Sequence, residues 1–224
     1  MMKQKIHSFD ERLYKQCKKE LNKKPVKEII SSYKKQCKIK TGYEPEFLSH
    51  YYSPILTVLK QFIGRLKNKH ILEIGYRMPM FLDYLKEQDV TVYGIDIEPY
   101  ITNKNLLKMS VGNVSKKFLK EHKNQFHAII ERITLSRLYD EEYFLENGKH
   151  RFKNKEKILF NLYHLLKPKG ILVLQDDRGT IFTEAQFAKI GFKKIMKEIP
   201  LAFRDKKSKN LGWNVLITYQ KPAR

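Results

Sequence analysis

Two carboxylates and one glycine are the residues of this chain whose types and spacing are most suited to chemistry. Glu73 and Gly75 come at the end of a short apolar segment, and Asp96 ends a second one. A glycine at the end of a strand permits a tight turn and lets a ligand approach the backbone closely. An acid at the end of the next strand can accept hydrogen bonds from ribose hydroxyls. The spacing therefore predicts a site for a nucleotide-like ligand.

The segments around these residues predict a strand, a turn, a helix and a second strand. Residues 70–74 and 90–96 are short apolar runs rich in β-branched side chains. Between them, apolar residues such as Phe81 and Leu85 recur at helical spacing. In such a βαβ unit the two strands are parallel, so their carboxyl ends meet at one edge of the sheet.

The rest of the chain continues to alternate between strand and helix patterns. A connector containing Val111, Gly112 and Asn113 follows the second strand, and a proline–glycine stop at 167–170 ends a later helix. The alternation predicts an α/β fold with a mostly parallel sheet covered on both faces. Helices are expected at 46–69, 115–122, 155–166 and 183–190, and strands at 126–130, 171–174, 192–198 and 213–219.

Residues 1–45 are expected to form a basic helical segment that precedes a domain at 46–224. Ser8 and Glu11 have the spacing of a capping box, which predicts the start of a first helix, and Pro25 suits the first turn of a second. Two interpretations of this segment stay open. It is either a helical lid or support packed on the domain, or a basic arm that guides substrate.

The charge of the chain is strongly positive, with 45 Lys and Arg against 24 Asp and Glu and a formal net charge of +21. Such a charge is typical of proteins that bind nucleic acids. Only nine of these basic residues are Arg, and the chain is also rich in Ile, Asn, Tyr and Phe, as codon bias in an AT-rich genome would produce. A solvated lysine-rich surface is therefore slightly preferred to a dedicated RNA-binding surface.

Composition also limits the compartment. No apolar run approaches the length of a membrane span, and the first residues lead into no signal-type apolar core. Cys17 and Cys37 are too few for a disulfide framework and have no neighbours at metal-ligand spacing. A reducing cytoplasm without membrane attachment is expected, and nothing in the sequence predicts an oligomeric state.

Over roughly residues 50–222, the order of these motifs resembles the class I S-adenosylmethionine-dependent methyltransferases. The first strand of that family ends in E-x-G-x-G-x-G. Here Glu73 and Gly75 match the acid and the first glycine, while Arg77 and Pro79 replace the next two glycines. The family's L-K-P-G-G before the fifth strand appears as L-K-P-K-G at 166–170.

The fourth-strand pattern of the family is also present, at 126–137, with His127 in place of its acid. We expect His127 to be a packed or edge histidine and not a catalyst. The resemblance implies a three-layer Rossmann-like methyltransferase sheet, mostly parallel with an antiparallel last strand, to which N-terminal helices are added.

The resemblance further implies S-adenosylmethionine as the cofactor. Asp96 would hold the ribose hydroxyls and Asn113 would lie near the adenine amine. Arg77 has two interpretations: its side chain fills the place of the methionine part of the cofactor, or it pairs with a carboxylate of cofactor or substrate. We favour retained cofactor binding, with Pro79 fixing the first turn of the helix. The expected cofactor-binding residues are Glu73, Gly75, Tyr76, Arg77, Asp96, Ile97 and Asn113.

Acceptor-side residues in this fold lie at the carboxyl ends of the fourth and fifth strands. Glu131 and Asp176 fall there and are the candidates for catalytic residues. Together with Asp177 they could bind Mg²⁺, which would lower the pKa of an acceptor hydroxyl. We prefer the alternative that these acids are solvated or cap a helix, with no metal. The polar segment 139–154 is expected to form a functional loop over this edge of the sheet.

The predicted function is methyl transfer from S-adenosylmethionine, to a small molecule in preference to RNA. The alternative is a catalytically degenerate member of this fold that binds nucleic acid or a protein partner. No Asn/Asp-Pro-Pro-aromatic motif follows the fourth strand, and no Pro-Cys pair occurs. Methylation of exocyclic amines of DNA bases and of cytosine C5 is therefore disfavoured.

Overall fold

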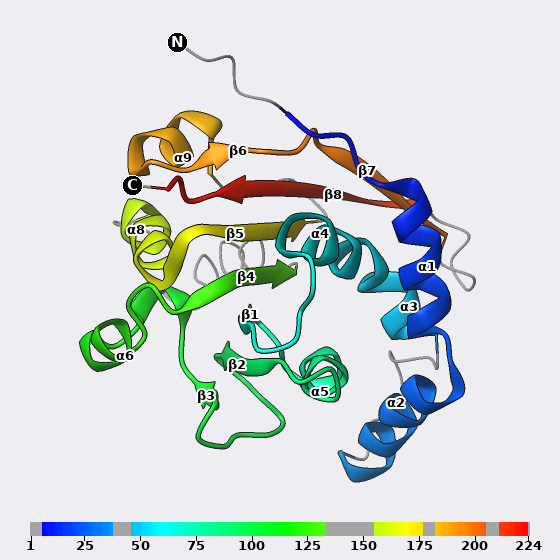
Figure 1. The fold of residues 1–224 in the computed structure, drawn as a ribbon. Coiled ribbons are helices and arrows are strands. Elements are labelled where there is room, and N and C mark those ends of the chain that lie inside the picture. Colours follow the sequence, from blue (N-terminus) through cyan, green and yellow to red (C-terminus); the bar gives the residue numbers. More distant parts are fainter. Residues whose placement is uncertain (1–5, 38–45, 133–154, 177–181, 205–210, 224) are drawn as a thin grey trace.

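A computed structural model describes residues 6–37, 46–132, 155–176, 182–204 and 211–223 (Figure 1). An eight-stranded sheet has the order β3-β2-β1-β4-β5-β8-β6, and β7 also pairs with β8. The strands are β1 His70–Ile74, β2 Thr91–Asp96, β3 Leu106–Lys108, β4 Phe126–Arg132, β5 Leu166–Asp176, β6 Lys193–Lys194, β7 Ile199–Arg204 and β8 Leu211–Gln220. Strands β1 to β5 pair in parallel, whereas β8 runs antiparallel to β5, as the arrows in Figure 1 show. The predicted α/β sheet with an antiparallel last strand is confirmed.

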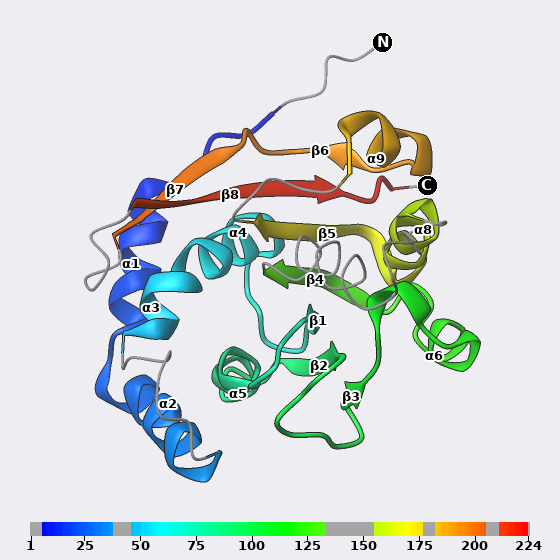
Figure 2. The same ribbon diagram turned by 180° about the vertical axis from the view of Figure 1, so that it is seen from behind.

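Helices cover both faces of the sheet, so the fold has three layers. Figures 1 and 2 show α1, α2 and α3 at one side of the sheet and α6, α8 and α9 at the other. Successive residues of β1 face opposite layers: Ile71 packs in one hydrophobic core and Leu72 in the other. The helices are α1 Glu11–Leu21, α2 Lys24–Gln36, α3 Phe47–Tyr51, α4 Ser53–Ile63, α5 Met80–Lys86, the 3₁₀ turn η1 Val111–Asn113, α6 Lys116–Glu121, α8 Lys155–Leu165 and α9 Glu184–Ile190.

The N-terminal helices share the core of the sheet. Cys17 and Leu21 of α1 and Ile30 of α2 are fully buried in the hydrophobic cluster that contains Ile71 of β1. The cap of α1 differs from the expectation: Asp10, and not Ser8, accepts a hydrogen bond from the backbone N–H of Leu13, at 2.8 Å. Asp10 directly precedes the helix and its carboxylate reaches the free N–H groups of the first turn. Pro25 lies in the first turn of α2, as predicted.

Two pairs of tyrosine and carboxylate tie these helices to α5. The Tyr84 hydroxyl donates to Glu20 of α1, and the Tyr33 hydroxyl of α2 donates to Asp83. Lys60 of α4 also donates to Glu20, at 2.6 Å. Because α5 directly follows the loop after β1, the N-terminal helices support the helix that positions this loop.

The structure corrects three expected elements. The helix expected at 46–69 is divided into α3 and α4, and the expected connector contains the edge strand β3. In place of the single strand expected at 192–198, the structure has the short strand β6 and, after a break, the separate strand β7. Both of them pair with β8. At the break between β6 and β7, the backbone N–H of His7 donates to Ile195 O at 2.8 Å. An N-terminal segment therefore pairs with the chain at this point. These short elements depend on pairing with a neighbour, and periodicity alone does not reveal them.

The remaining expected elements are confirmed in type and order, but β5 begins at Leu166, directly after α8, and not at 171 as expected. Both cysteines are free thiols. In the part of the chain that the structure describes, no helix has the length and apolar character needed to cross a membrane.

Candidate functional site

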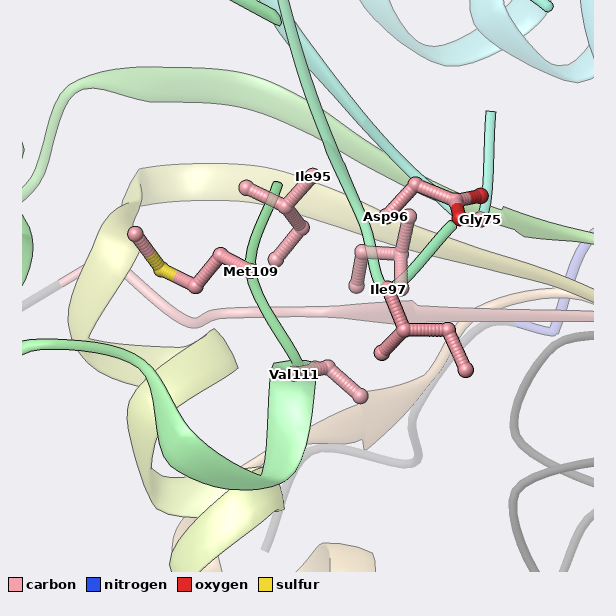
Figure 3. A pocket seen from close by; sticks show the side chains of 7 residues that line it. Gly75, Ile95, Asp96, Ile97, Met109 and Val111 are labelled. Carbon is pink, nitrogen blue, oxygen red and sulfur yellow. The ribbon is translucent and has the colours of Figure 1, made fainter. Parts of the chain in front are cut away.

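The carboxyl ends of β1, β2 and β3 border a hollow of about 220 Å³, a volume that includes space open to solvent. The strand order reverses between β1 and β4, and ligands of open α/β sheets bind at the carboxyl ends beside such a reversal. Figure 3 shows apolar side chains around the hollow and the Asp96 carboxylate beside Gly75. The lining residues are Ile74, Gly75, Ile95, Asp96, Ile97, Met109 and Val111.

Gly75 makes the turn that opens the hollow. Its φ is +73°, a left-handed conformation that favours glycine, and its N–H donates to Ile95 O at 2.8 Å. This bond holds the turn against the end of β2. The sequence-predicted role of Gly75 as a tight turn is therefore what the backbone shows.

The Asp96 carboxylate connects the two loops that flank the hollow. Its Oδ2 accepts from the Arg77 N–H at 2.8 Å, and its Oδ1 accepts from the Glu98 N–H at 2.7 Å. A carboxylate has about four lone-pair positions, and these two bonds use one on each oxygen. Asp96 therefore holds the loop in shape and still has the capacity to accept two hydroxyl groups.

Arg77 has a backbone conformation that favours glycine. Its φ is +41°, in the left-handed region. The exposed side chain turns towards Tyr100, with Cζ 5.2 Å from the ring centroid and Nη2 3.5 Å from the hydroxyl oxygen. Tyr100 N–H in turn donates to Arg77 O at 2.9 Å. Arg77 does not line the hollow, so the space beside Gly75 is not filled by its side chain.

The left-handed backbone at Arg77 predicts an unusual order of stabilities for two variants. Arg77→Gly and Arg77→Ala both remove the guanidinium, but only glycine adopts positive φ without strain. We expect Arg77→Gly to exceed Arg77→Ala in free energy of unfolding by about 1 kcal/mol, measured by urea denaturation. At Lys117, which lies in helix α6, the order should be reversed: Lys117→Ala should be more stable than Lys117→Gly. Equal stabilities at position 77 would contradict the left-handed assignment.

Tyr76 is a core residue of the loop. It is 3% exposed, and its hydroxyl donates to Ile101 O at 2.7 Å. Its ring lies against Gly94 of β2: a Cβ at Gly94 would be 2.5 Å from Tyr76 Cδ1 and 3.0 Å from Leu106 Cδ2. Tyr76 thus anchors the loop against β2 and does not line the hollow.

Gly94→Ala is expected to destabilise the protein because the added methyl group would collide with the anchored ring of Tyr76. Overpacking of this kind costs on the order of 2 kcal/mol, measurable by chemical denaturation. Gly112→Ala is the matched control, since its Cβ would come no closer than 3.6 Å to the Ser110 hydroxyl. If both variants were equally stable, the close packing of Tyr76 on β2 would be refuted.

Glu73 lies fully buried at the end of β1, on the face covered by α4. Its Oε1 accepts from the Tyr52 hydroxyl at 2.7 Å, and Tyr52 stacks on Phe81 of α5 with ring centroids 4.4 Å apart. Burial raises the pKa of the Glu73 carboxyl to about 7, although the Tyr52 hydrogen bond and the Arg132 charge lower it. Glu73 supports the site from the opposite face of the sheet and does not line the hollow.

Of the residues expected to bind the cofactor, the structure brings Gly75, Asp96 and Ile97 to the hollow. Asn113 is exposed in η1, two residues beyond the lining residue Val111. The lining residues missed from the sequence are apolar. Met109 could have been found only if β3 had been recognised, because it directly follows this strand.

The candidate acceptor-side acids are described only in part. Glu131 is fully buried in β4, level with Ile74 of β1 and Leu174 of β5. Asp176 is the last residue of β5, whereas Asp177 and the loop 139–154 lie outside the described residues. Among the residues that are described, no three His, Cys, Asp or Glu could hold a metal ion. The Mg²⁺ hypothesis on Glu131, Asp176 and Asp177 stays a prediction.

His127 lies near the amino ends of the strands, whereas the hollow lies at their carboxyl ends. Its Nδ1 accepts from the backbone N–H of His70 at 3.0 Å, near the amino ends of β1 and β4. Burial, together with the charge of Lys167, lowers the pKa of His127 to about 4. A neutral histidine that accepts a backbone hydrogen bond is a structural residue, as expected.

Solved structures to which this chain is similar in fold include S-adenosylmethionine-dependent methyltransferases. The 1,6-didemethyltoxoflavin-N1-methyltransferase of Burkholderia thailandensis, with 1,6-didemethyltoxoflavin and S-adenosylhomocysteine bound, has a TM-score of 0.53 and 13% identity, over 88% of this chain and 87% of its own. An S-adenosylmethionine-dependent methyltransferase from Aquifex aeolicus has 0.51 and 18%, over 85% and 97%. One from Methanosarcina mazei has 0.51 and 14%, over 75% and 98%. No protein-family model and no curated protein match the sequence.

Proposed function

We propose that this chain, which has the class I S-adenosylmethionine-dependent methyltransferase fold, transfers a methyl group from S-adenosylmethionine to a small molecule. The observation that carries the proposal is the hollow at the carboxyl ends of β1 and β2, where Gly75 and Asp96 meet. The side chains that replace the family's glycines turn away from this space or take no part in its lining. The altered loop is therefore compatible with a bound nucleoside.

The residues around the hollow fit the nucleoside part of this cofactor. Ile97, Met109 and Val111 supply the apolar contacts that a planar base requires, and the Asp96 carboxylate can accept from ribose hydroxyls. The tight turn at Gly75 lets the ligand approach the backbone. Asn113 is proposed to contact the base edge from η1.

When bound, S-adenosylmethionine supplies a methyl group on a positively charged sulfur, which an acceptor nucleophile displaces in line. The work of this chain is to orient the two reactants and to exclude water. Asp96 would fix the ribose and thereby the position of the reacting carbon. Glu131 and Asp176 are proposed as the residues that would take a proton from an acceptor that carries one.

The small-molecule acceptor is preferred because the B. thailandensis neighbour, with which this chain shares its fold, has 1,6-didemethyltoxoflavin bound. Calorimetric titration of the purified protein with S-adenosylmethionine and S-adenosylhomocysteine tests the proposal. Micromolar binding of both is expected. No binding by folded protein would refute cofactor use and favour the degenerate, partner-binding alternative.

The net charge of +21 is the one observation that favours nucleic acid as a partner. Titration with a fluorescent single-stranded RNA at several salt concentrations tests this second candidate. A steep fall of affinity with salt would indicate many phosphate contacts, because each contact releases bound counterions. Weak binding with little dependence on salt would leave the small-molecule function alone.

A further inference from the structure

Arg132, at the end of β4, is held between three aromatic rings. Its Cζ lies 5.2 Å from the ring centroid of Phe47, 5.4 Å from Tyr51 and 5.3 Å from Tyr52. A guanidinium is attracted to aromatic faces, and its planar fork of five N–H donors matches the geometry of a carboxylate. All three rings come from α3 and the residue after it. These rings therefore hold the guanidinium of Arg132 in one place before any ligand binds.

Gln175 lies beside Arg132. The two residues are direct partners in the pairing of β4 with β5, so their side chains leave the sheet on the same face. Gln175 is fully buried, and among the described residues neither atom of its amide has a hydrogen-bond partner. Buried amides are nearly always bonded. The buried amide therefore indicates that a polar group of a ligand can bind here.

The charge around the two side chains favours an anion. Glu73 is a nearby carboxyl, and burial raises its pKa to about 7, so this group is partly protonated at neutral pH. Glu73 then offsets the charge of Arg132 only in part. The net charge of +21 adds a positive field over the whole chain.

We propose that Arg132 and Gln175 form a carboxylate-binding subsite at the carboxyl ends of β4 and β5. The Arg132 guanidinium would donate to the carboxylate beside its contacts with the aromatic rings, and Gln175 would donate from its Nε2. The carboxylate belongs either to the acceptor or to the amino-acid end of the cofactor. In both forms the role in methyl transfer rests on the proposed function, whereas carboxylate binding does not.

Three probes separate the two sources. S-adenosylhomocysteine carries the carboxylate, methylthioadenosine is the matching nucleoside without it, and benzoate is a carboxylate without a nucleoside. Calorimetry and thermal shift would compare the wild type with Arg132→Met. Arg65→Met is the control, because it removes an exposed guanidinium in the segment that precedes β1.

A cofactor carboxylate predicts that the wild type binds S-adenosylhomocysteine at least tenfold tighter than methylthioadenosine, and that Arg132→Met removes the difference. An acceptor carboxylate predicts equal binding of the two nucleosides and stabilisation by benzoate that is lost in Arg132→Met. The subsite is refuted if Arg132→Met responds to all probes as the wild type does. It is also refuted if the wild type neither responds to benzoate nor distinguishes the nucleosides. Benzoate binding that requires Arg132, without nucleoside binding, would support the subsite and refute the proposed function.

Two milder variants guard against a simple loss of folding. Arg132→Lys keeps a positive charge beside Glu73 but removes the planar guanidinium, so about tenfold weaker carboxylate binding is expected in a variant that still folds. Gln175→Leu replaces the amide by an apolar group of similar size. The ligand-free protein should therefore be no less stable than the wild type, and carboxylate binding should be several-fold weaker. Wild-type affinity in both variants would overturn the proposal.

Discussion

Asp96→Ala is expected to weaken binding of S-adenosylhomocysteine by at least about 100-fold in calorimetric titration, because two hydrogen bonds to a charged group are lost. The carboxylate lies at the hollow, and only one position on each oxygen is used by the N–H groups of Arg77 and Glu98. The ribose would thus lose its two acceptors together. No other single change in the lining removes a charged hydrogen-bonding group.

The same substitution also frees the Arg77 and Glu98 N–H groups, so loss of binding must be separated from loss of the loop. Asp96→Asn keeps one acceptor oxygen and should bind with intermediate affinity. Asp89→Ala is the matched control, since it removes an exposed carboxylate that pairs with Lys67 at 2.9 Å. Wild-type affinity in Asp96→Ala, with a melting temperature near that of the wild type, would rule out ribose binding by this residue.

Glu73→Gln is expected to change how stability depends on pH. Burial raises the pKa of the Glu73 carboxyl from 4.5 to about 7. The folded state therefore holds a proton that the unfolded state releases at lower pH. The stability from this proton is fully present below pH 4.5 and is lost as the pH rises through about 7.

The amide variant has no such proton to lose. Relative to the wild type, Glu73→Gln should gain stability between pH 5 and 8, by up to about 3 kcal/mol, since one pKa unit corresponds to about 1.4 kcal/mol. Urea denaturation at intervals across this range measures the difference. Glu87→Gln, at an exposed position after α5, controls for the substitution itself. A constant difference between wild type and Glu73→Gln would show that Glu73 is ionised in the folded protein throughout this range.

The fold and the centre of the site were predictable because their signals are local. Gly75 and Asp96 each end a short apolar strand, and the βαβ connection brings such ends to one edge whatever the rest of the chain does. The helices with strong periodicity or clear caps, such as α6 and α9, were predicted at nearly their observed positions. Short edge elements such as β3 have no periodicity of their own and were missed.

The direction of the loop side chains could not be predicted in this way. Arg77 occupies the position of a glycine, and its spacing alone allowed it either to fill the site or to bind a carboxylate. The bond from Arg77 N–H to Asp96 holds the backbone in a left-handed turn, and this turn sends the guanidinium to Tyr100. That outcome depends on the loop after β1 meeting the end of β2 and the residues that follow it.

The sequence by itself therefore determined the α/β order of elements, the turn at Gly75 and the carboxylate at Asp96, because each follows from neighbouring residues and the geometry of parallel strands. Only the tertiary structure decided which face of the sheet each polar side chain occupies. Tyr52, Glu73 and Arg132 come from three distant segments, and their contacts arise from the packing of α3 and α4 on β1 and β4. No spacing in the chain encodes such a meeting, since it depends on how the layers close over the core.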